Sequence, residues 1–166
     1  VFDDVIVSTE DREIADIARA WGASVSWRSD ELADDTATVV QVCTQVLEHM
    51  QAAGKCPRTF CCIYPTAVLV PWEDLVASGN MMDEPPEADV VMGVSTYPIH
   101  PYKAMEDQGG HLKLVFPDKA MQKSQNYPHF VASNGTLYWA KTETFLENPS
   151  FYTDHLKGYE LDDDKA

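Results

Sequence analysis

One short stretch, Thr59 to Tyr64, constrains the fold of this 166-residue chain more than any other. Its β-branched, aromatic and cysteine side chains follow one another without polar alternation, which is typical of strands buried on both faces of a parallel sheet. Pro65 has no backbone N–H to donate, so the chain leaves the sheet there. Ligands of open α/β sheets lie outside the carboxyl ends of the strands. The turn Tyr64–Ala67 is therefore the first candidate site, with an ordinary strand exit as the alternative.

The residues before this strand predict a β-α-β unit and a second helix. Short strands are expected at residues 5–7 and 23–27, with a helix between them. The apolar face of that helix is expected to consist of Ile14, Ile17, Ala18 and Trp21. A polar loop, residues 28–38, leads into the second helix, which Gly54 ends. The buried stripe expected on the second helix consists of Val39, Cys43, Val46, Leu47 and Met50.

The second half of the chain predicts shorter strands and a long loop. Helices are expected at residues 71–78 and 142–147, and strands at 88–96, 102–105, 111–115, 137–140 and 158–161. Gly109-Gly110 is typical of a hairpin turn. Residues 116–130 are polar and aromatic without periodicity, and a loop of that length in a compact domain is usually functional or part of an oligomer contact.

This order of elements predicts an α/β fold, a three-layer α/β/α sandwich. Its sheet is expected to be mostly parallel, with a small antiparallel part in the second half. The length fits one domain, residues 1–166. Neither of the Gly-rich phosphate-binding patterns, GxGxxG and GxxxxGK[ST], occurs in the sequence.

Charge and cysteine content restrict the class of partner. The chain carries 12 basic and 27 acidic residues, a formal net charge of −15, which repels phosphate backbones and disfavours nucleic acid. No apolar run approaches the roughly 20 residues that span a bilayer, so no membrane partner is expected. The four cysteines and five histidines lack ligand spacing, so no metal-ligating residue is predicted. Free cysteines are typical of a reducing cytoplasm. Cys61 and Cys62 are expected to face opposite sides of their strand.

Four separated segments resemble, in order and spacing, the acylneuraminate cytidylyltransferases, which make CMP-activated nonulosonic acids. They read VFDDVIVSTEDREIADIARAWGASV, WRSDELADDTAT, FCCIYPTAVL and SQNYPHFVASNGTLYW. Within this family the chain looks closest to the pseudaminic acid cytidylyltransferases, through CCIYPTA, Tyr97-Pro98-Ile99, Lys123-Ser124-Gln125 and Leu137-Tyr138-Trp139. The resemblance implies a Rossmann-like nucleotidyltransferase fold, whose long loop and antiparallel strands form a dimer arm.

The resemblance also implies which residues contact the nucleotide. Arg28 matches the nucleotide-site arginine of the family, and surface pairing with Asp30 or Glu31 is the alternative. Tyr64, Pro65, Thr66 and Ala67 match the family's nucleotide-contacting turn, whose backbone and threonine hydroxyl would contact cytosine or ribose.

Residues just before the second helix are assigned to the nucleotide in the same way. Asp35 and Thr38 precede a helix N-terminus, where free N–H groups attract anions. Asp35 or Thr36 would serve equally well as the helix N-cap, so both roles stay open.

The sugar-acid contacts implied by the resemblance lie in the second half of the chain. Lys103 stands where the family has a basic residue near the sugar carboxylate. Lys123 and Gln125 match an Arg-Ser-Gln of pseudaminate relatives, and lysine lacks the bidentate fork of arginine. Asn134 and Gly135 would form the floor of the sugar pocket, although Asn-Gly alone is typical of a hairpin turn.

The implied reaction is transfer of CMP from CTP to a pseudaminate-like nonulosonic acid, with release of pyrophosphate, assistance by Mg²⁺ and a homodimeric enzyme. The family's nucleotide loop and its metal-binding Asp segment would lie before Val1 and after Ala166, so a single truncated domain is expected. Two alternatives stay open. One is a non-catalytic α/β domain that retains the sugar-acid half-site and the dimer surface. The other is a Rossmann-type oxidoreductase, which the missing Gly-rich fingerprint disfavours.

Overall fold

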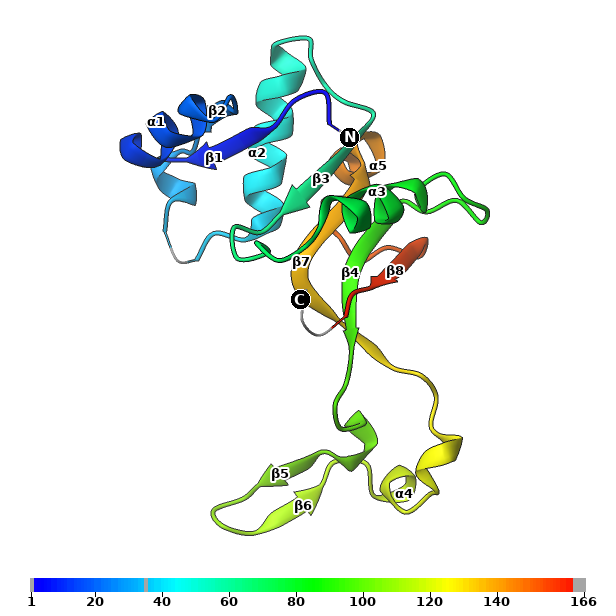
Figure 1. Ribbon diagram of the computed structural model, residues 1–166. Helices are drawn as coiled ribbons and strands as arrows, with labels where there is room; N and C mark the ends of the chain where they lie inside the picture. The colour runs from blue at the N-terminus through cyan, green and yellow to red at the C-terminus, as the bar shows by residue number, and fades with distance from the viewer. Residues whose placement is uncertain (1, 35, 163–166) are drawn as a thin grey trace.

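The computed structural model describes residues 2–34 and 36–162. Its strands belong to three sheets (Figure 1). β1 (Ile6–Thr9) pairs in parallel with β2 (Ser24–Trp27). β5 (Met105–Asp107) and β6 (Leu112–Leu114) form an antiparallel hairpin. The central sheet has the strand order β3 (Thr59–Ile63), β7 (Val131–Lys141), β4 (Val90–Thr96) and β8 (Leu156–Glu160).

Strand direction in the central sheet follows from the path of the chain. β7 is antiparallel to both β3 and β4, and β8 is parallel to β4, so three of the four strands run the same way. The expected α/β class with one prevailing strand direction is therefore confirmed. The expectation of parallel neighbours for β3 was wrong in one respect. Within the described chain its hydrogen-bonded neighbour is β7, which enters the sheet antiparallel between β3 and β4.

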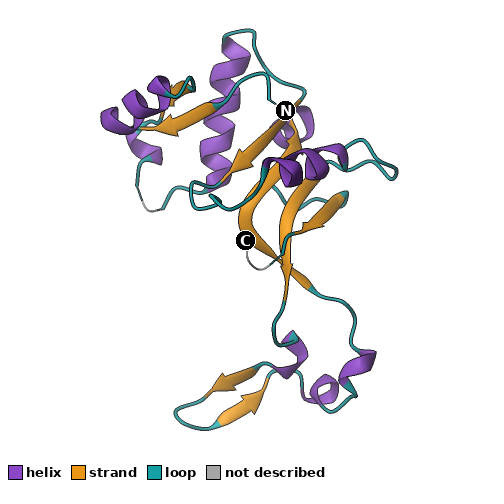
Figure 2. Cartoon of the chain, viewed as in Figure 1, coloured by secondary structure: helices purple, strands orange, loops and turns teal. Residues whose placement is uncertain are grey.

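Helices cover both faces of the central sheet, as the sequence predicts (Figure 2). On one face α2 (Val39–Ala52) and α5 (Thr142–Glu147) pack over Phe60 and Cys62 of β3, with Leu47 and Phe145 almost fully buried. On the other face α3 (Trp72–Asn80) packs near Cys61 and Trp139. Because alternate residues of a strand point to opposite faces, Cys61 and Cys62 separate into the two cores, which confirms that prediction.

Capping side chains fix where the first two helices begin. The Asp11 carboxylate accepts from Glu13 N at 2.7 Å and begins α1 (Arg12–Ala20). Thr38 begins α2 through a capping box with Gln41, so the N-cap is Thr38 and not Asp35 or Thr36. Asp35 itself lies outside the described residues.

The apolar face expected for the first helix is only partly buried. Ala15 and Ala18 are the buried residues of α1, whereas Ile14, Ile17 and Trp21 are half or more exposed. The reason is that, in the described chain, α1 packs mainly on the small sheet of β1 and β2, with Ala15 and Ala18 as its buried residues. The stripe on α2 is also less covered than expected, since Leu47 alone is fully buried.

Residues 97–130 form a lobe that projects from the sheet between β4 and β7 (Figure 1). It contains η2 (Pro101–Lys103), the β5–β6 hairpin, α4 (Pro117–Ala120) and η3 (Ser124–Asn126). The expected strand at residues 102–105 was wrong: the chain makes a 3₁₀ turn there, and the strand starts at Met105. Gly109 and Gly110 have positive φ and make the predicted hairpin turn.

None of the described helices is both long and apolar enough to cross a bilayer.

Candidate functional site

The chain leaves β3 through a hydrogen-bonded turn at Tyr64–Ala67. Tyr64 N donates to Thr136 O at 2.9 Å, which extends the pairing with β7 by one residue. Ala67 N then donates to Tyr64 O at 2.9 Å, and this closes a four-residue turn with Pro65 in its favoured second position. Pro65 and Thr66 are exposed. The turn therefore presents the Thr66 hydroxyl and free backbone groups at the carboxyl end of β3.

A large bulge in β7 lies beside this turn. Met92 of β4 faces Tyr138, but Val94 faces Ser133, so residues 134–137 oppose Gly93 alone. Asn134 braces the bulge: its Oδ1 accepts from the Thr136 hydroxyl at 2.6 Å, and its Nδ2 donates to Ser95 Oγ at 3.1 Å. Bulges of this kind re-aim side chains and are frequent next to active sites.

Two glycines allow the bulge to form. A Cβ on Gly93 would collide with the Thr136 hydroxyl and with the side-chain oxygen of Asn134. Gly135 has a φ of +71°, a conformation that side chains rarely adopt. Asn134-Gly135 therefore belongs to a bulged strand and not to a hairpin turn. The α-carbon of Gly135 lies against the Tyr64 ring, since a Cβ added to Gly135 would be 3.8 Å from a carbon of that ring.

Tyr64 forms the wall between the turn and the bulge. Its ring lies 5.7 Å from that of Tyr138, whose hydroxyl is 2.7 Å from Ser133 Oγ. Burial, with smaller contributions from Tyr138 and nearby thiols, raises the pKa of Tyr64 to about 12. Tyr64 is thus neutral at physiological pH, and its ring provides an apolar surface with one hydroxyl.

Arg28 stands at the carboxyl ends of β1 and β2. Its Nη2 donates to Ser8 O at 2.8 Å, and its Nη1 lies 3.5 Å from a Glu10 carboxylate oxygen. The alternative pairing with Asp30 or Glu31 does not occur. Arg28 Nε and Ser8 Oγ are buried without hydrogen-bond partners among the described residues. Because both atoms are buried, an anion reaches them only if the Arg28 side chain turns outward.

The loop before α2 is organised by Asp34. Its Oδ1 accepts from Thr36 N at 2.8 Å, from the Thr36 hydroxyl at 2.6 Å and from Ala37 N at 3.1 Å. The bond from the Thr36 hydroxyl is the main reason that the pKa of Asp34 is lowered. Thr38 is already engaged as the N-cap, so its hydroxyl is occupied by helix α2.

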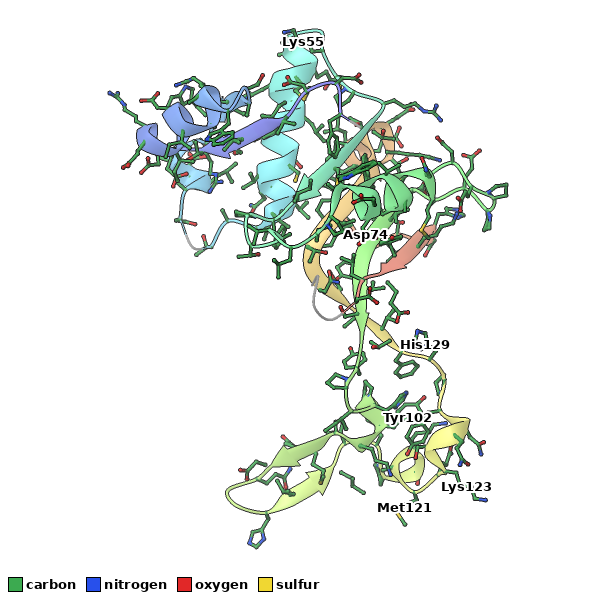
Figure 3. All side chains as sticks on the ribbon, in the orientation of Figure 1. Lys55, Asp74, Tyr102, Met121, Lys123 and His129 are labelled. Carbon is green, nitrogen blue, oxygen red and sulfur yellow. The ribbon has the colours of Figure 1, made fainter. Side chains whose placement is uncertain are left out.

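Three of the residues assigned to the sugar, Lys103 and the long-loop residues Lys123 and Gln125, lie in the projecting lobe, away from the Tyr64 turn. Lys103 Nζ donates to Ala120 O at 2.7 Å and lies 5.9 Å from the Tyr127 ring. Lys123 and Gln125 are exposed, and Figure 3 shows Lys123 at the far part of the lobe. The structure thus brings Tyr64 together with Asn134 and Gly135, but not with Lys103, Lys123 or Gln125 of the same chain.

A cavity lies at the neck of the lobe, and the sequence did not predict it. It has a volume of about 320 Å³ and is lined by Thr96, Tyr97, His100, Ser124, Tyr127, Pro128, His129 and Phe130. His100 is fixed in it, because its Nε2 bonds Pro128 O at 3.0 Å and its Nδ1 accepts from Tyr102 N. The many aromatic and histidine residues between positions 97 and 130 are the sequence feature that could have indicated this cavity.

The described side chains do not form a metal site. In residues 2–34 and 36–162, no group of three or more His, Cys, Asp or Glu is placed to hold an ion.

The fold is that of a Rossmann-like nucleotidyltransferase. A solved CMP:2-keto-3-deoxy-manno-octonic acid synthetase, complexed with CTP, has the same fold with a TM-score of 0.59 at 11% identity, over 95% of this chain and 72% of that one. The family model described as cytidylyltransferase matches residues 1–166, so the chain belongs to the cytidylyltransferase family.

Two named relatives match more than nine tenths of this chain. A Helicobacter pylori protein named pseudaminic acid cytidylyltransferase and UDP-2,4-diacetamido-2,4,6-trideoxy-beta-L-altropyranose hydrolase is 24% identical over 97% of this chain, which spans 31% of that protein. The CMP-N,N'-diacetyllegionaminic acid synthase of Legionella pneumophila is 28% identical over 93% of this chain and 67% of its own length. The chain thus spans between about a third and two thirds of these relatives.

Proposed function

We propose that the protein transfers CMP from CTP to a nonulosonic acid of the pseudaminic or legionaminic type and releases pyrophosphate. Membership of the cytidylyltransferase family and the names of the relatives support this reaction. The observation that carries the proposal is the contact between the Tyr64–Ala67 turn and the Asn134–Gly135 bulge. It places the segment assigned to the nucleotide beside the segment assigned to the sugar.

In this proposal, the nucleotide is bound at the carboxyl ends of β1 and β3. The Thr66 hydroxyl and the backbone of the exposed turn contact cytosine or ribose, and the Tyr64 ring forms one wall. Arg28 contacts a phosphate when its guanidinium, whose Nε is buried in the structure, turns towards the nucleotide. Asp35 and Thr38 are still predicted to contact the nucleotide. Thr38 would do so through the N-terminus of α2, which it caps.

The sugar acid then lies over the bulge of β7. Asn134 is engaged by Ser95 and Thr136 within the bulge, so we assign it a positioning role: it holds the floor against which the sugar rests. The anomeric hydroxyl oxygen attacks the α-phosphorus of CTP. The new O–P bond forms as the bond to the bridging oxygen breaks, and pyrophosphate leaves.

The sugar carboxylate is bound by a second copy of the chain. Lys103, Lys123 and Gln125 fall within residues 97–130, the lobe that projects away from its own sheet (Figure 1), so a homodimer that exchanges lobes supplies them in trans. The exposed apolar side chains of the hairpin, Met105 and Leu112, fit such a contact.

Magnesium is proposed from the chemistry of the reaction, because a divalent cation neutralises the departing pyrophosphate. The described residues do not form a ligand set for it, so no step is assigned through the ion. A reducing cytoplasm is proposed as the location, since all four cysteines are free.

A pyrophosphate-release assay tests the reaction. The full-length protein is supplied with CTP, and in parallel with UTP, together with pseudaminic, legionaminic or N-acetylneuraminic acid. Release is expected with CTP and one of the first two acids. Inactivity of the full-length protein towards all three acids would overturn the proposal. CTP binding without release would favour a non-catalytic binding domain.

A further inference from the structure

His100 joins the two segments that connect the lobe to the central sheet. Its Nε2 lies 3.0 Å from Pro128 O, on the segment that returns to β7, and its Nδ1 accepts from Tyr102 N at 3.2 Å. A carbonyl oxygen can only accept and a backbone N–H can only donate. The two partners therefore assign the hydrogen of the neutral imidazole to Nε2 and leave Nδ1 as the acceptor. Both ring nitrogens are occupied within the lobe, and the ring is held in one orientation.

The bond from Tyr102 N shapes the turn that carries Lys103. It makes His100 the N-cap of η2, and the backbone N–H of Lys103 donates to His100 O at 2.9 Å. A side-chain cap of this kind fixes the backbone of the residues that follow it. The direction in which the Lys103 side chain leaves the turn therefore depends on His100.

The bond to Pro128 brings Tyr127 beside the Lys103 ammonium. The Tyr127 ring lies 4.6 Å from the His100 ring and 5.9 Å from Lys103 Nζ. Lys103 Nζ donates to Ala120 O at 2.7 Å, and the Tyr127 hydroxyl lies 3.3 Å from the same carbonyl oxygen. An ammonium has three hydrogens, so within the described chain two of them are left for an anion. Lys103 is thus held in place with part of its charge available.

We infer that His100 is a positioning residue, which holds Lys103 in the orientation that binds the carboxylate of the sugar acid. The inference rests on the proposed function, which assigns Lys103 to that carboxylate. A lysine that is already ordered loses less side-chain freedom on binding than a freely solvated one. His100 acts through Lys103, so it favours binding of the sugar acid and does not change the binding of CTP.

Three substitutions separate the two hydrogen bonds from the packing of the ring. His100→Phe keeps an aromatic ring and removes both bonds. His100→Asn places an amide oxygen where it can accept from Tyr102 N, and His100→Gln can reach Pro128 O with an amide N–H. His111→Phe is the matched control, because it removes an exposed histidine beside β6 in the same lobe. Circular dichroism checks that each variant is folded.

Pyrophosphate release by the full-length protein, measured as a function of each substrate, tests the role. We expect His100→Phe to raise the KM for the sugar acid about tenfold, with kcat and the KM for CTP within about twofold of the wild type. His100→Asn and His100→Gln should each recover part of the change, and His111→Phe should behave as the wild type. With an active wild type, an unchanged KM in His100→Phe, or a fall in kcat alone, would overturn the inference and leave the proposed reaction standing. No release by the wild type would overturn the proposed function.

Competitive acetylation tests the orientation of Lys103 without the reaction. The purified chain is treated with limiting acetic anhydride, and mass spectrometry compares labelling of Lys103 with that of Lys55, an exposed lysine of the body far from the lobe (Figure 3). We expect Lys103 to react several-fold more slowly than Lys55 in the wild type, and its rate to rise towards that of Lys55 in His100→Phe. Equal rates in the wild type, or a ratio that His100→Phe leaves unchanged, would show that His100 does not hold Lys103.

Discussion

Tyr64 shows how a single residue can serve both the fold and the site. Its backbone continues the β3–β7 pairing, its ring lies against Gly135, and its carbonyl closes the turn that presents Thr66. The same burial that makes the ring a wall of the site keeps its hydroxyl protonated. The sequence predicted a site at this residue from the strand ending. It could not predict the contact with Gly135, which depends on the bulge of a strand about 70 residues later (135 − 64 = 71).

Tyr64 should make stability depend on pH in the alkaline range. Its pKa is about 12 in the folded chain against an ordinary value of 10.0. As the pH rises, the Tyr64 hydroxyl loses its proton in the unfolded chain before it does so in the folded chain. The contribution of Tyr64 to the free energy of unfolding is therefore complete below pH 10 and is lost as the pH rises to about 12. Urea denaturation at several pH values measures the slope. Tyr64→Phe should flatten it, and an unchanged slope in that variant would contradict the assignment.

Gly93 should be sensitive to a single methyl group. In Gly93→Ala the new Cβ collides with the Thr136 hydroxyl and the Asn134 amide oxygen, so we expect a loss of about 1–3 kcal/mol in the free energy of unfolding. Urea denaturation measures it. The double variant Gly93→Ala/Thr136→Ala removes one colliding atom and should recover part of the loss. Full stability of Gly93→Ala would mean that the bulge is packed differently.

At the scale of elements, the local sequence predicts where helices and strands lie, but it does not predict how distant strands pair. The Thr59 run, Gly54 and Pro71 gave the positions of β3, of the end of α2 and of the start of α3 correctly. The antiparallel entry of β7 was missed, because only the return of the chain from the lobe sets its direction. The exposure of Trp21 was also missed, since helical periodicity identifies an apolar face but not whether a sheet covers it.

The capping box should account for part of the stability of α2. Thr38→Ala removes the side chain that accepts from Gln41 N, and we expect a loss of about 1 kcal/mol in the free energy of unfolding. Thr36→Ala is the matched control, because Thr36 lies outside the helix and its hydroxyl bonds to Asp34 and not to an N–H group of α2. It should stay within about 0.5 kcal/mol of the wild type. Equal losses in the two variants would contradict Thr38 as the cap.

At the scale of the molecule, the candidate site divides into a body and a lobe. Arg28, the Tyr64 turn and Asn134 belong to the body, whereas Lys103, Lys123 and Gln125 fall within residues 97–130, which form the lobe (Figure 1). One chain therefore does not assemble the complete set of proposed contacts. The proposed second copy would supply the missing contacts by inserting its lobe, so the oligomeric state is part of the proposed function.

Sedimentation velocity tests the exchange of lobes. The protein is expected to sediment as a dimer, and Leu112→Glu should weaken association at least about tenfold by placing a charge on the exposed apolar face of β6. Lys113→Glu is the matched control, because its side chain points to the other face of the same strand. A wild-type monomer, or equal effects of the two variants, would contradict lobe exchange.

Calorimetric titration of CTP, in the presence of Mg²⁺, into the purified chain tests most directly whether the Tyr64–Ala67 turn binds a nucleotide. Saturable binding of one CTP per chain is expected, with weaker binding of UTP. Thr66→Val removes the hydroxyl and keeps the shape, so it should weaken CTP binding about five- to tenfold. Lys113→Ala on the lobe hairpin should leave it unchanged. No binding of CTP by the folded wild type, or full affinity in Thr66→Val, would contradict a nucleotide site at this turn.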